Sequence, residues 1–242
     1  MDASHGRLFQ LALWCAVFGA GTGGWFAYFR LKERTPRPFL VMLAATLGGF
    51  AAALASVLVY EKLEMLAAMP SWSNLESGGL IGLQSSLLIG LVEEGTKLVP
   101  TFLVVMVSRR VERTQDAIFI AACAGVGFAA AENMLLWEAG MSGLDALARA
   151  VASPVTHALF AAPWGLGLGR LVRTGQVRTL VLGFAASVMA HAVYDLLLAA
   201  PNLPHAVAAG EVLVLWVWML VRTAPSVIAR VTSAGLPAMR RV

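Results

Sequence analysis

The chain has 242 residues, of which 59% are hydrophobic and only 13% are charged, and its mean hydropathy is +0.75. Soluble domains carry roughly 25% charged residues, so this composition excludes an ordinary water-soluble protein and predicts an integral membrane protein. The net charge of +4 comes from short basic clusters between apolar runs rather than from one basic face. We therefore expect a lipid bilayer around the protein and no nucleic-acid partner.

Seven apolar runs follow one another along the chain, and polar residues separate them. They cover residues 8–29, 39–60, 80–107, 117–137, 147–169, 179–200 and 207–221. A helix of about 20 apolar residues crosses a bilayer. The sequence thus predicts an all-α, polytopic transmembrane bundle of about seven spans, which forms a single membrane domain over residues 1–242. The last run is short and contains Glu211, so six spans with one interfacial helix is the alternative.

The basic residues alternate between the segments that separate these runs. Of the 18 Lys and Arg residues, 14 follow the first, third, fifth and last runs, three lie in the other segments, and Lys97 lies inside a run. Lys and Arg are enriched in the loops that face the cytoplasm. This alternation predicts a multi-pass cell-membrane protein with its N-terminus outside and its C-terminus inside.

The third run contains an unusual group of charges, Glu93, Glu94 and Lys97. An ionised group in mid-membrane costs roughly 2.5–3.5 kcal/mol, so such groups usually face a bundle interior and have a function. Lys97 follows the two glutamates by four and three residues, a spacing at which it can neutralise one carboxylate. The other carboxylate could then take a proton from water as a general base. A structural ion-pair cluster between helices is the alternative.

The next three runs add further polar residues, which are Glu132, Asn133, His157, His191 and Asp195. At a rise of about 1.5 Å per residue, Glu93 and Glu132 lie about 21–22 Å, and the histidines about 18 Å, from the predicted cytoplasmic ends of their helices. This common depth predicts one shared site, slightly toward the outer side, in a four-span core over residues 80–200. Unrelated hydrogen-bonding residues are the alternative explanation.

Asp195 follows His191 by four residues, so both lie on one helix face. A carboxylate in this arrangement can accept a hydrogen bond from one ring nitrogen and direct the other nitrogen toward a substrate or metal. We expect Asp195 and Asn133 to have supporting roles. Glu132 is either a third carboxylate of the site or a partner for a hydrogen bond between helices.

Small residues recur in two of the runs, and they include Gly125, Gly127, Gly165 and Gly169. Small residues at helical spacing let two transmembrane helices approach closely. We interpret these glycines as packing surfaces rather than as parts of a site.

Several motifs occur in a fixed order along most of the chain. They are Glu93-Glu94-x-x-Lys97, Phe128-x-x-x-Glu132-Asn133, His157 followed by the glycine-rich residues 165–169, His191-x-x-x-Asp195, and a basic, proline-bearing segment at residues 30–38. Together they resemble the PrsW family of bacterial intramembrane proteases and, more distantly, the CAAX-type prenyl-protein endopeptidases. The prenyl proteases have a histidine where Glu132 stands and an asparagine where Asp195 stands, and these departures weaken any transfer of their substrate choice.

The resemblance implies hydrolysis of a peptide bond inside a bacterial inner or plasma membrane. The expected substrate is a membrane-anchored, single-span protein resembling an anti-sigma factor, cleaved from its outer side during regulated stress signalling. The implied catalytic set is Glu93, Glu94, Glu132, His157 and His191, with Lys97, Asn133 and Asp195 in support.

Two mechanisms follow from this set. In the first, Glu93 or Glu94 activates a water, and His157 or His191 stabilises the oxyanion or protonates the leaving amine. In the second, a zinc ion is bound by His157, His191 and one of three glutamates, Glu93, Glu94 or Glu132. The sequence has no H-E-x-x-H motif, which favours metal-free chemistry and leaves zinc as the open alternative.

Two other classes of function are compatible with the same residues. Carboxylates, a lysine and histidines at one depth also suit a proton- or ion-coupled transporter, although we find no duplicated halves of the kind many transporters have. A membrane protein that binds a partner helix without catalysis is the third possibility.

Overall fold

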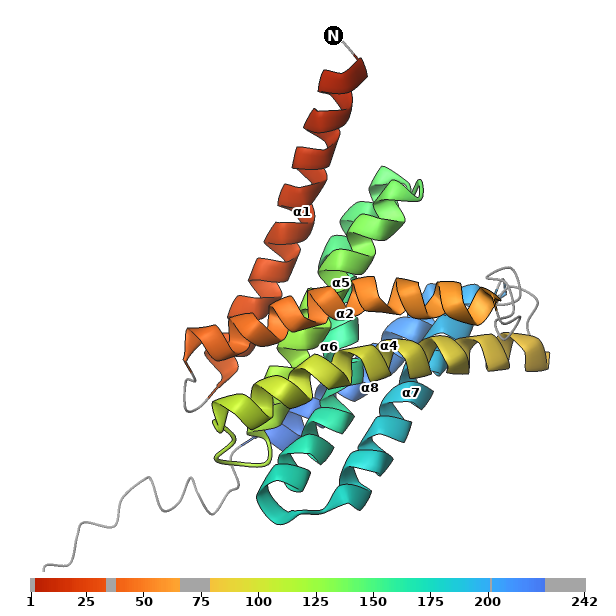
Figure 1. Cartoon of the computed structure of the whole chain (residues 1–242). Coiled ribbons are helices and arrows are strands. Elements are labelled where there is room, and N and C mark those ends of the chain that lie inside the picture. Colours follow the sequence, from red (N-terminus) through yellow and green to blue (C-terminus); the bar gives the residue numbers. More distant parts are fainter. Residues whose placement is uncertain (1–2, 34–37, 66–78, 201, 225–242) are drawn as a thin grey trace, which may run out of the picture.

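The computed structural model describes residues 3–33, 38–65, 79–200 and 202–224 (Figure 1). These residues form helices and contain no strand. The helices are α1 (Ala3–Lys32), α2 (Phe39–Met65), α4 (Gly79–Ser108), α5 (Asp116–Glu138), α6 (Gly143–Thr174), α7 (Val177–Ala199) and α8 (His205–Thr223). Each coincides with one predicted apolar run and extends beyond it at one or both ends. The prediction of an all-α helical bundle is confirmed.

Five of the helices are long and apolar enough to cross a membrane, namely α1 from Leu8, α2, α5, α7 and α8. The seventh predicted run, residues 207–221, forms helix α8. This helix has 19 residues, which is long enough for a span. The other two helices, α4 and α6, have 30 and 32 residues but carry buried polar side chains along their lengths. Those two helices supply much of the site described below.

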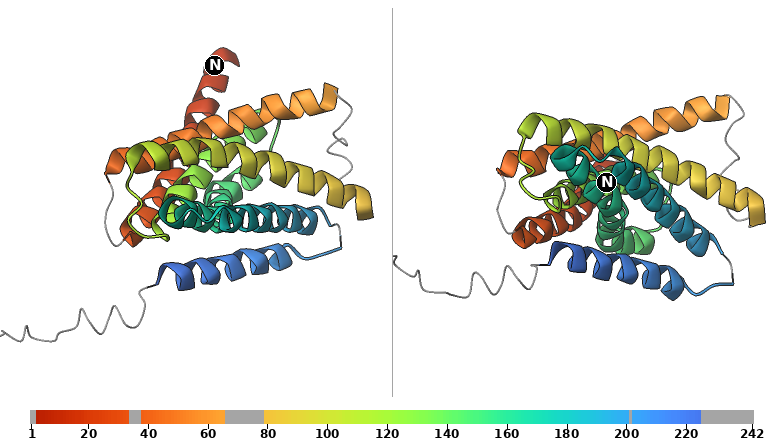
Figure 2. Two further views of the ribbon diagram at one scale, coloured as in Figure 1. Left: turned by 60° about the horizontal axis from the view of Figure 1, so that its bottom comes forward. Right: turned by 90° about the horizontal axis from the view of Figure 1, so that it is seen from below.

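Successive helices alternate in direction (Figures 1 and 2). The C-terminal ends of α1, α4, α6 and α8 lie toward the lower left of Figure 1, and their other ends lie toward the top and right. The described basic clusters after α4 and α6 therefore lie on the same side of the molecule, as the alternation of charge predicts. Which side faces the cytoplasm stays a prediction.

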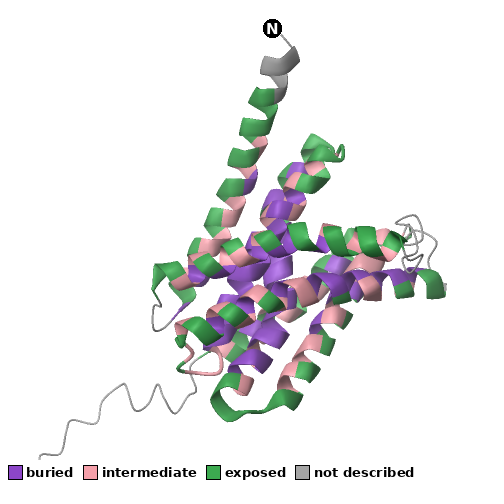
Figure 3. Cartoon of the chain, viewed as in Figure 1, coloured by how far each residue is buried: buried purple, intermediate pink, exposed green. Residues whose placement is uncertain are grey.

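Helix α5 forms the centre of the bundle, where its residues from Ala117 to Ala129 are all buried (Figure 3). It packs most extensively against α6 and α2. A methyl group at Gly127 would overlap the backbone of Thr46 in α2, and one at Gly125 would overlap the backbone of His157 in α6. The interpretation of these glycines as packing surfaces is confirmed, and the contact at Gly125 fixes the depth of a site histidine.

Candidate functional site

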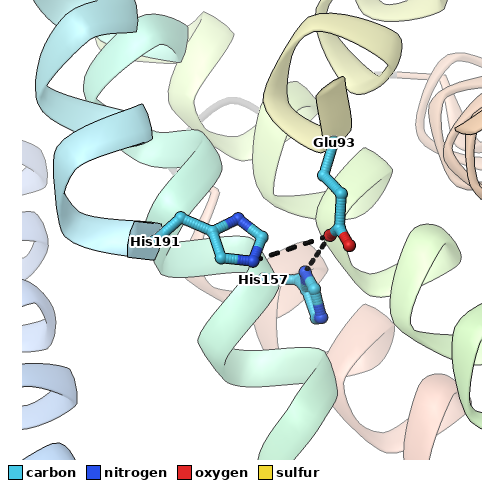
Figure 4. A group of neighbouring side chains, drawn as sticks. All are labelled: Glu93, His157 and His191. Carbon is cyan, nitrogen blue, oxygen red and sulfur yellow. Dashed lines mark ion pairs between the residues drawn. The ribbon is translucent and has the colours of Figure 1, made fainter. Parts of the chain in front are cut away.

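Three predicted site residues from three helices meet in the bundle interior. The Glu93 Oε2 atom of α4 lies 3.6 Å from His191 Nε2 of α7 and 3.9 Å from His157 Nδ1 of α6 (Figure 4). All three side chains are buried, and their possible ligand atoms lie within 4.8 Å of one another. The structure therefore brings together the residues that the depth argument placed in one layer.

The carboxylate of the second glutamate, Glu94, accepts hydrogen bonds from three side chains. Its Oε1 atom accepts from Lys97 Nζ at 2.8 Å and lies 3.0 Å from His191 Nδ1. Its Oε2 atom accepts from the Trp164 indole nitrogen at 2.9 Å. Three donors satisfy a carboxylate that has no exposure to solvent. Glu94 is thus placed to orient other side chains rather than to meet a substrate.

Lys97 is also fully buried and lies between the two glutamates and His157. Its Nζ atom is 2.8 Å from Glu94 Oε1, 3.5 Å from Glu93 Oε2 and 2.9 Å from His157 Nδ1. The same ammonium group lies 4.0 Å from the centre of the Phe128 ring. The closer carboxylate is that of Glu94, so the pairing expected from the sequence leaves Glu93 as the less neutralised glutamate.

The hydrogen-bond partners let us assign the proton positions on both histidines. Because the lysine ammonium can only donate, His157 Nδ1 accepts from Lys97, and His157 Nε2 carries the proton and donates to Glu132 Oε2 at 3.0 Å. Because Glu94 accepts, His191 Nδ1 donates, and only a neutral His191 ring leaves Nε2 without a proton. His157 Nδ1 and His191 Nε2 are the ring nitrogens that lie nearest to Glu93 Oε2.

Glu132 holds His157 rather than joining Glu93. Besides His157 Nε2, its Oε2 atom contacts the Arg149 guanidinium, and Arg149 also donates from Nε to Asn133 Oδ1 at 3.0 Å. Asn133 donates in return to the Arg149 carbonyl at 3.3 Å. These contacts tie α5 to α6 beside His157, which is the supporting role expected of Asn133.

Sequence reasoning assigned Arg149 to a segment between spans, but α6 begins at Gly143 and contains it. Its position inside the predicted run 147–169 could have indicated that Arg149 belongs to a helix. An arginine inside a span requires a carboxylate partner, and Glu132 in the preceding helix is that partner.

The arrangement expected around Asp195 is different in the structure. Asp195 Oδ2 lies 3.8 Å from His191 Nε2, which is too long for a hydrogen bond. The carboxylate that orients His191 is Glu94, which engages the opposite ring nitrogen. The reason is the ring orientation: the His191 imidazole stacks on Phe160, with ring centres 4.7 Å apart and planes 22° apart.

Two aromatic residues of the site were missed by sequence reasoning. The Tyr60 hydroxyl of α2 donates to Glu93 Oε1 at 3.2 Å, and the Trp164 indole of α6 donates to Glu94. An aromatic residue in an apolar run is ordinary, so nothing in the sequence distinguished these two. Tyr60 also extends the site beyond the predicted core of residues 80–200.

Two cavities reach the polar cluster from different sides. The larger, of about 270 Å³, lies between α2, α4 and α5 and is lined by Tyr60, Glu93 and Glu132 together with apolar residues. The smaller, of about 80 Å³, lies between α5, α6 and α7 and is lined by Glu132, His157 and His191 among others. Glu93 is thus accessible from the larger cavity, whereas Glu94 lines neither.

The donor set fits a divalent metal ion. Two imidazole nitrogens and one carboxylate oxygen match the ligands of catalytic zinc sites. The second nitrogen of each histidine is bonded to a carboxylate, as is usual for metal-ligating histidines. Of the three glutamates considered from the sequence, Glu93 belongs to this set. A cation bound at His157 Nδ1 would replace the contact with Lys97, because that nitrogen has one lone pair.

Comparison with known proteins identifies the family of this chain. The model of the family described as PrsW family intramembrane metalloprotease matches residues 35–224, which include α2 through α8 and exclude α1. No curated protein and no solved structure matches the chain. The matched region covers more than half of the chain and contains every residue of the polar cluster. The chain therefore belongs to the PrsW family of intramembrane metalloproteases.

Proposed function

We propose that this protein hydrolyses a peptide bond of a single-span membrane protein inside the bilayer, with Glu93 as the general base. The observation that carries the proposal is the Glu93 carboxylate at the wall of a cavity, close to His157 Nδ1 and His191 Nε2. Membership of the family supports the class of reaction.

In the proposed reaction, Glu93 takes a proton from a water molecule, and the water oxygen attacks the scissile carbonyl carbon. Negative charge develops on the carbonyl oxygen, and Tyr60 provides a hydroxyl donor in the same cavity. The carbon–nitrogen bond then breaks as Glu93 returns the proton to the leaving amine. The products are one carboxylic acid and one amine, which ionise to a carboxylate and an ammonium group, so atoms and charge balance.

A zinc or similar divalent ion, when held by Glu93, His157 and His191, would supply Lewis-acid activation of the water and the carbonyl. In that version Glu93 would be a ligand of the ion, and its role as the free base belongs to the metal-free version. The family is described as a metalloprotease, which favours the metal-dependent mechanism. The absence of an H-E-x-x-H motif favoured the metal-free mechanism instead. In either version, Glu94 and Glu132 orient the two histidines, and Lys97 keeps Glu94 ionised.

The substrate and its side of access remain part of the proposal. The resemblance of the motifs to the PrsW family implies an anti-sigma-factor-like protein of a bacterial cell membrane, cleaved from its outer side. The estimated depth of Glu93, slightly toward the predicted outer side, supports access from there.

The proposed function is tested with the purified protein in liposomes that contain labelled single-span proteins. Wild type should release a cleaved fragment, and Glu93→Ala and His191→Ala should not. Cleavage that survives Glu93→Ala, Glu94→Ala and His191→Ala contradicts the assignment. Ion flux without cleavage in the same liposomes would favour the transporter alternative.

Metal dependence is measured on the same preparation. Elemental analysis should find about one zinc or similar ion per chain in wild type, and less in His157→Ala. Activity that persists in a metal-depleted preparation would contradict the metal-dependent mechanism and support the metal-free one.

A further inference from the structure

The larger cavity has an acidic mouth. Besides Tyr60, it is lined at the C-terminal end of α2 by Glu61 and Glu64, and both side chains are exposed. Lys62 lies between them in sequence but does not line the cavity. The cavity therefore presents two exposed carboxylates at the C-terminal end of α2, and Glu93 and Glu132 line it further inside.

The rest of the cavity wall is largely apolar. Val57 of α2 and Leu135 and Leu136 of α5 line the cavity, and the two leucines are 38% and 37% exposed. Exposed apolar side chains on a transmembrane helix face lipid, so this wall continues onto the lipid-facing surface. An apolar peptide segment can move from the bilayer into such a cavity without losing its apolar surroundings.

The spacing along α2 sets a length scale for what the cavity can hold. Tyr60, which contacts Glu93, and Glu64 are one helical turn apart, or about 6 Å. An extended peptide advances about 3.3 Å per residue. A residue that meets Glu64 would therefore be about two to four residues from the peptide bond at Glu93, once side-chain reach is included.

We propose that this cavity binds an extended, apolar membrane segment whose flank carries a lysine or arginine, and that Glu61 and Glu64 recognise that basic residue. The inference rests on the proposed function only for the position of the cut bond. Single-span proteins concentrate their basic residues on the cytoplasmic side, so a basic residue at the predicted outer mouth would distinguish a minority of membrane proteins as substrates.

The binding inference is tested without turnover, in the Glu93→Gln protein in detergent micelles with a photo-crosslinking amino acid at position 57. The probes are two synthetic peptides with one shared leucine–alanine segment, flanked at one end by two lysines or by two glutamates. Labelling of the lysine peptide should exceed that of the glutamate peptide by about three- to tenfold, as two partly exposed ion pairs predict.

The decisive variant is Glu61→Lys with Glu64→Lys, which should reverse the preference in favour of the glutamate peptide. A new preference for the glutamate peptide also shows that the double variant is folded, so its stability needs no separate measurement. Glu112→Lys, which changes an exposed glutamate at the opposite end of the bundle, should leave the preference unchanged. A crosslinker at Leu58, which is 62% exposed, reports association through the lipid-facing surface and should show no preference.

Equal labelling of both peptides at position 57, or a preference that survives the double reversal, would overturn the inference. The outcome is separable from the proposed function. Charge-dependent labelling without wild-type cleavage of the lysine peptide contradicts the protease mechanism alone, and cleavage of both peptides at equal rates contradicts the charge recognition alone.

Discussion

The two adjacent glutamates of α4 lie in two contrasting halves of the polar cluster. We call Glu94, Lys97 and Trp164 the closed half, because each of these side chains is fully buried and Glu94 accepts from both of the others. Glu93, Tyr60 and the larger cavity form the open half. Identical residue types one position apart thus have different surroundings, one saturated with donors and one at the wall of a cavity.

Helix geometry explains why neighbouring residues separate in this way. Consecutive side chains on a helix point about 100° apart, so Glu94 faces α6 and α7 whereas Glu93 reaches toward α2. The histidines connect the halves, since His191 bonds to Glu94 through one nitrogen and faces Glu93 with the other. The closed half holds the geometry that the open half uses for chemistry.

Glu93→Gln should have the largest effect on activity in the open half. The amide keeps the size of the side chain but cannot take a proton from water, so we expect cleavage to fall about 10³-fold. The unfolding temperature in detergent should stay close to that of wild type, because an amide still accepts from Tyr60. Glu112→Gln is the matched control, with activity expected to be normal. Residual activity within tenfold of wild type would remove Glu93 from the role of base.

Tyr60→Phe tests the hydroxyl of the open half. The substitution removes one donor to Glu93 and to the developing oxyanion, so kcat should fall about 10²-fold while KM changes little. Steady-state kinetics with a single-span substrate separate the two parameters. A rise in KM alone would give Tyr60 a binding role instead.

Arg149→Met tests the support behind His157. Without the guanidinium, His157 is the described side-chain partner that Glu132 keeps, and the contacts of Arg149 that join α5 to α6 are lost. We therefore expect activity to fall about tenfold. Arg149→Lys should recover part of the loss, because the charge returns without the fork that also reaches Asn133. If Lys behaves no better than Met, the arginine does not act through its charge on Glu132.

Trp164→Phe should have the smallest effect on activity and a clear effect on stability. Phenylalanine removes the donor to Glu94 Oε2 and leaves a buried acceptor unpaired, which costs about 1–3 kcal/mol. Thermal unfolding in detergent measures the loss, and kcat should change by no more than a few fold. A large fall in kcat with unchanged stability would place Trp164 in the open half.

The sequence predicted the seven helices and the meeting of Glu93, His157 and His191, because apolar run length and the rise per residue determine span and depth. It did not predict that Glu94 rather than Asp195 orients His191, since that depends on the ring stacking against Phe160. Tyr60 and Trp164 were missed because an aromatic residue in an apolar span carries no signal of its partner. Such contacts depend on how the helices rotate and pack against one another. The spacing of apolar residues in the sequence does not determine that packing.

The most direct test of the account is a paired measurement of cleavage rate and thermal unfolding for Glu93→Gln and Glu94→Gln. We predict that Glu93→Gln loses activity and keeps its stability, whereas Glu94→Gln is destabilised by about 3–5 kcal/mol because buried Lys97 loses its closest counter-charge. The opposite pattern, a stable but inactive Glu94→Gln beside an active Glu93→Gln, would contradict the assignment of the two halves.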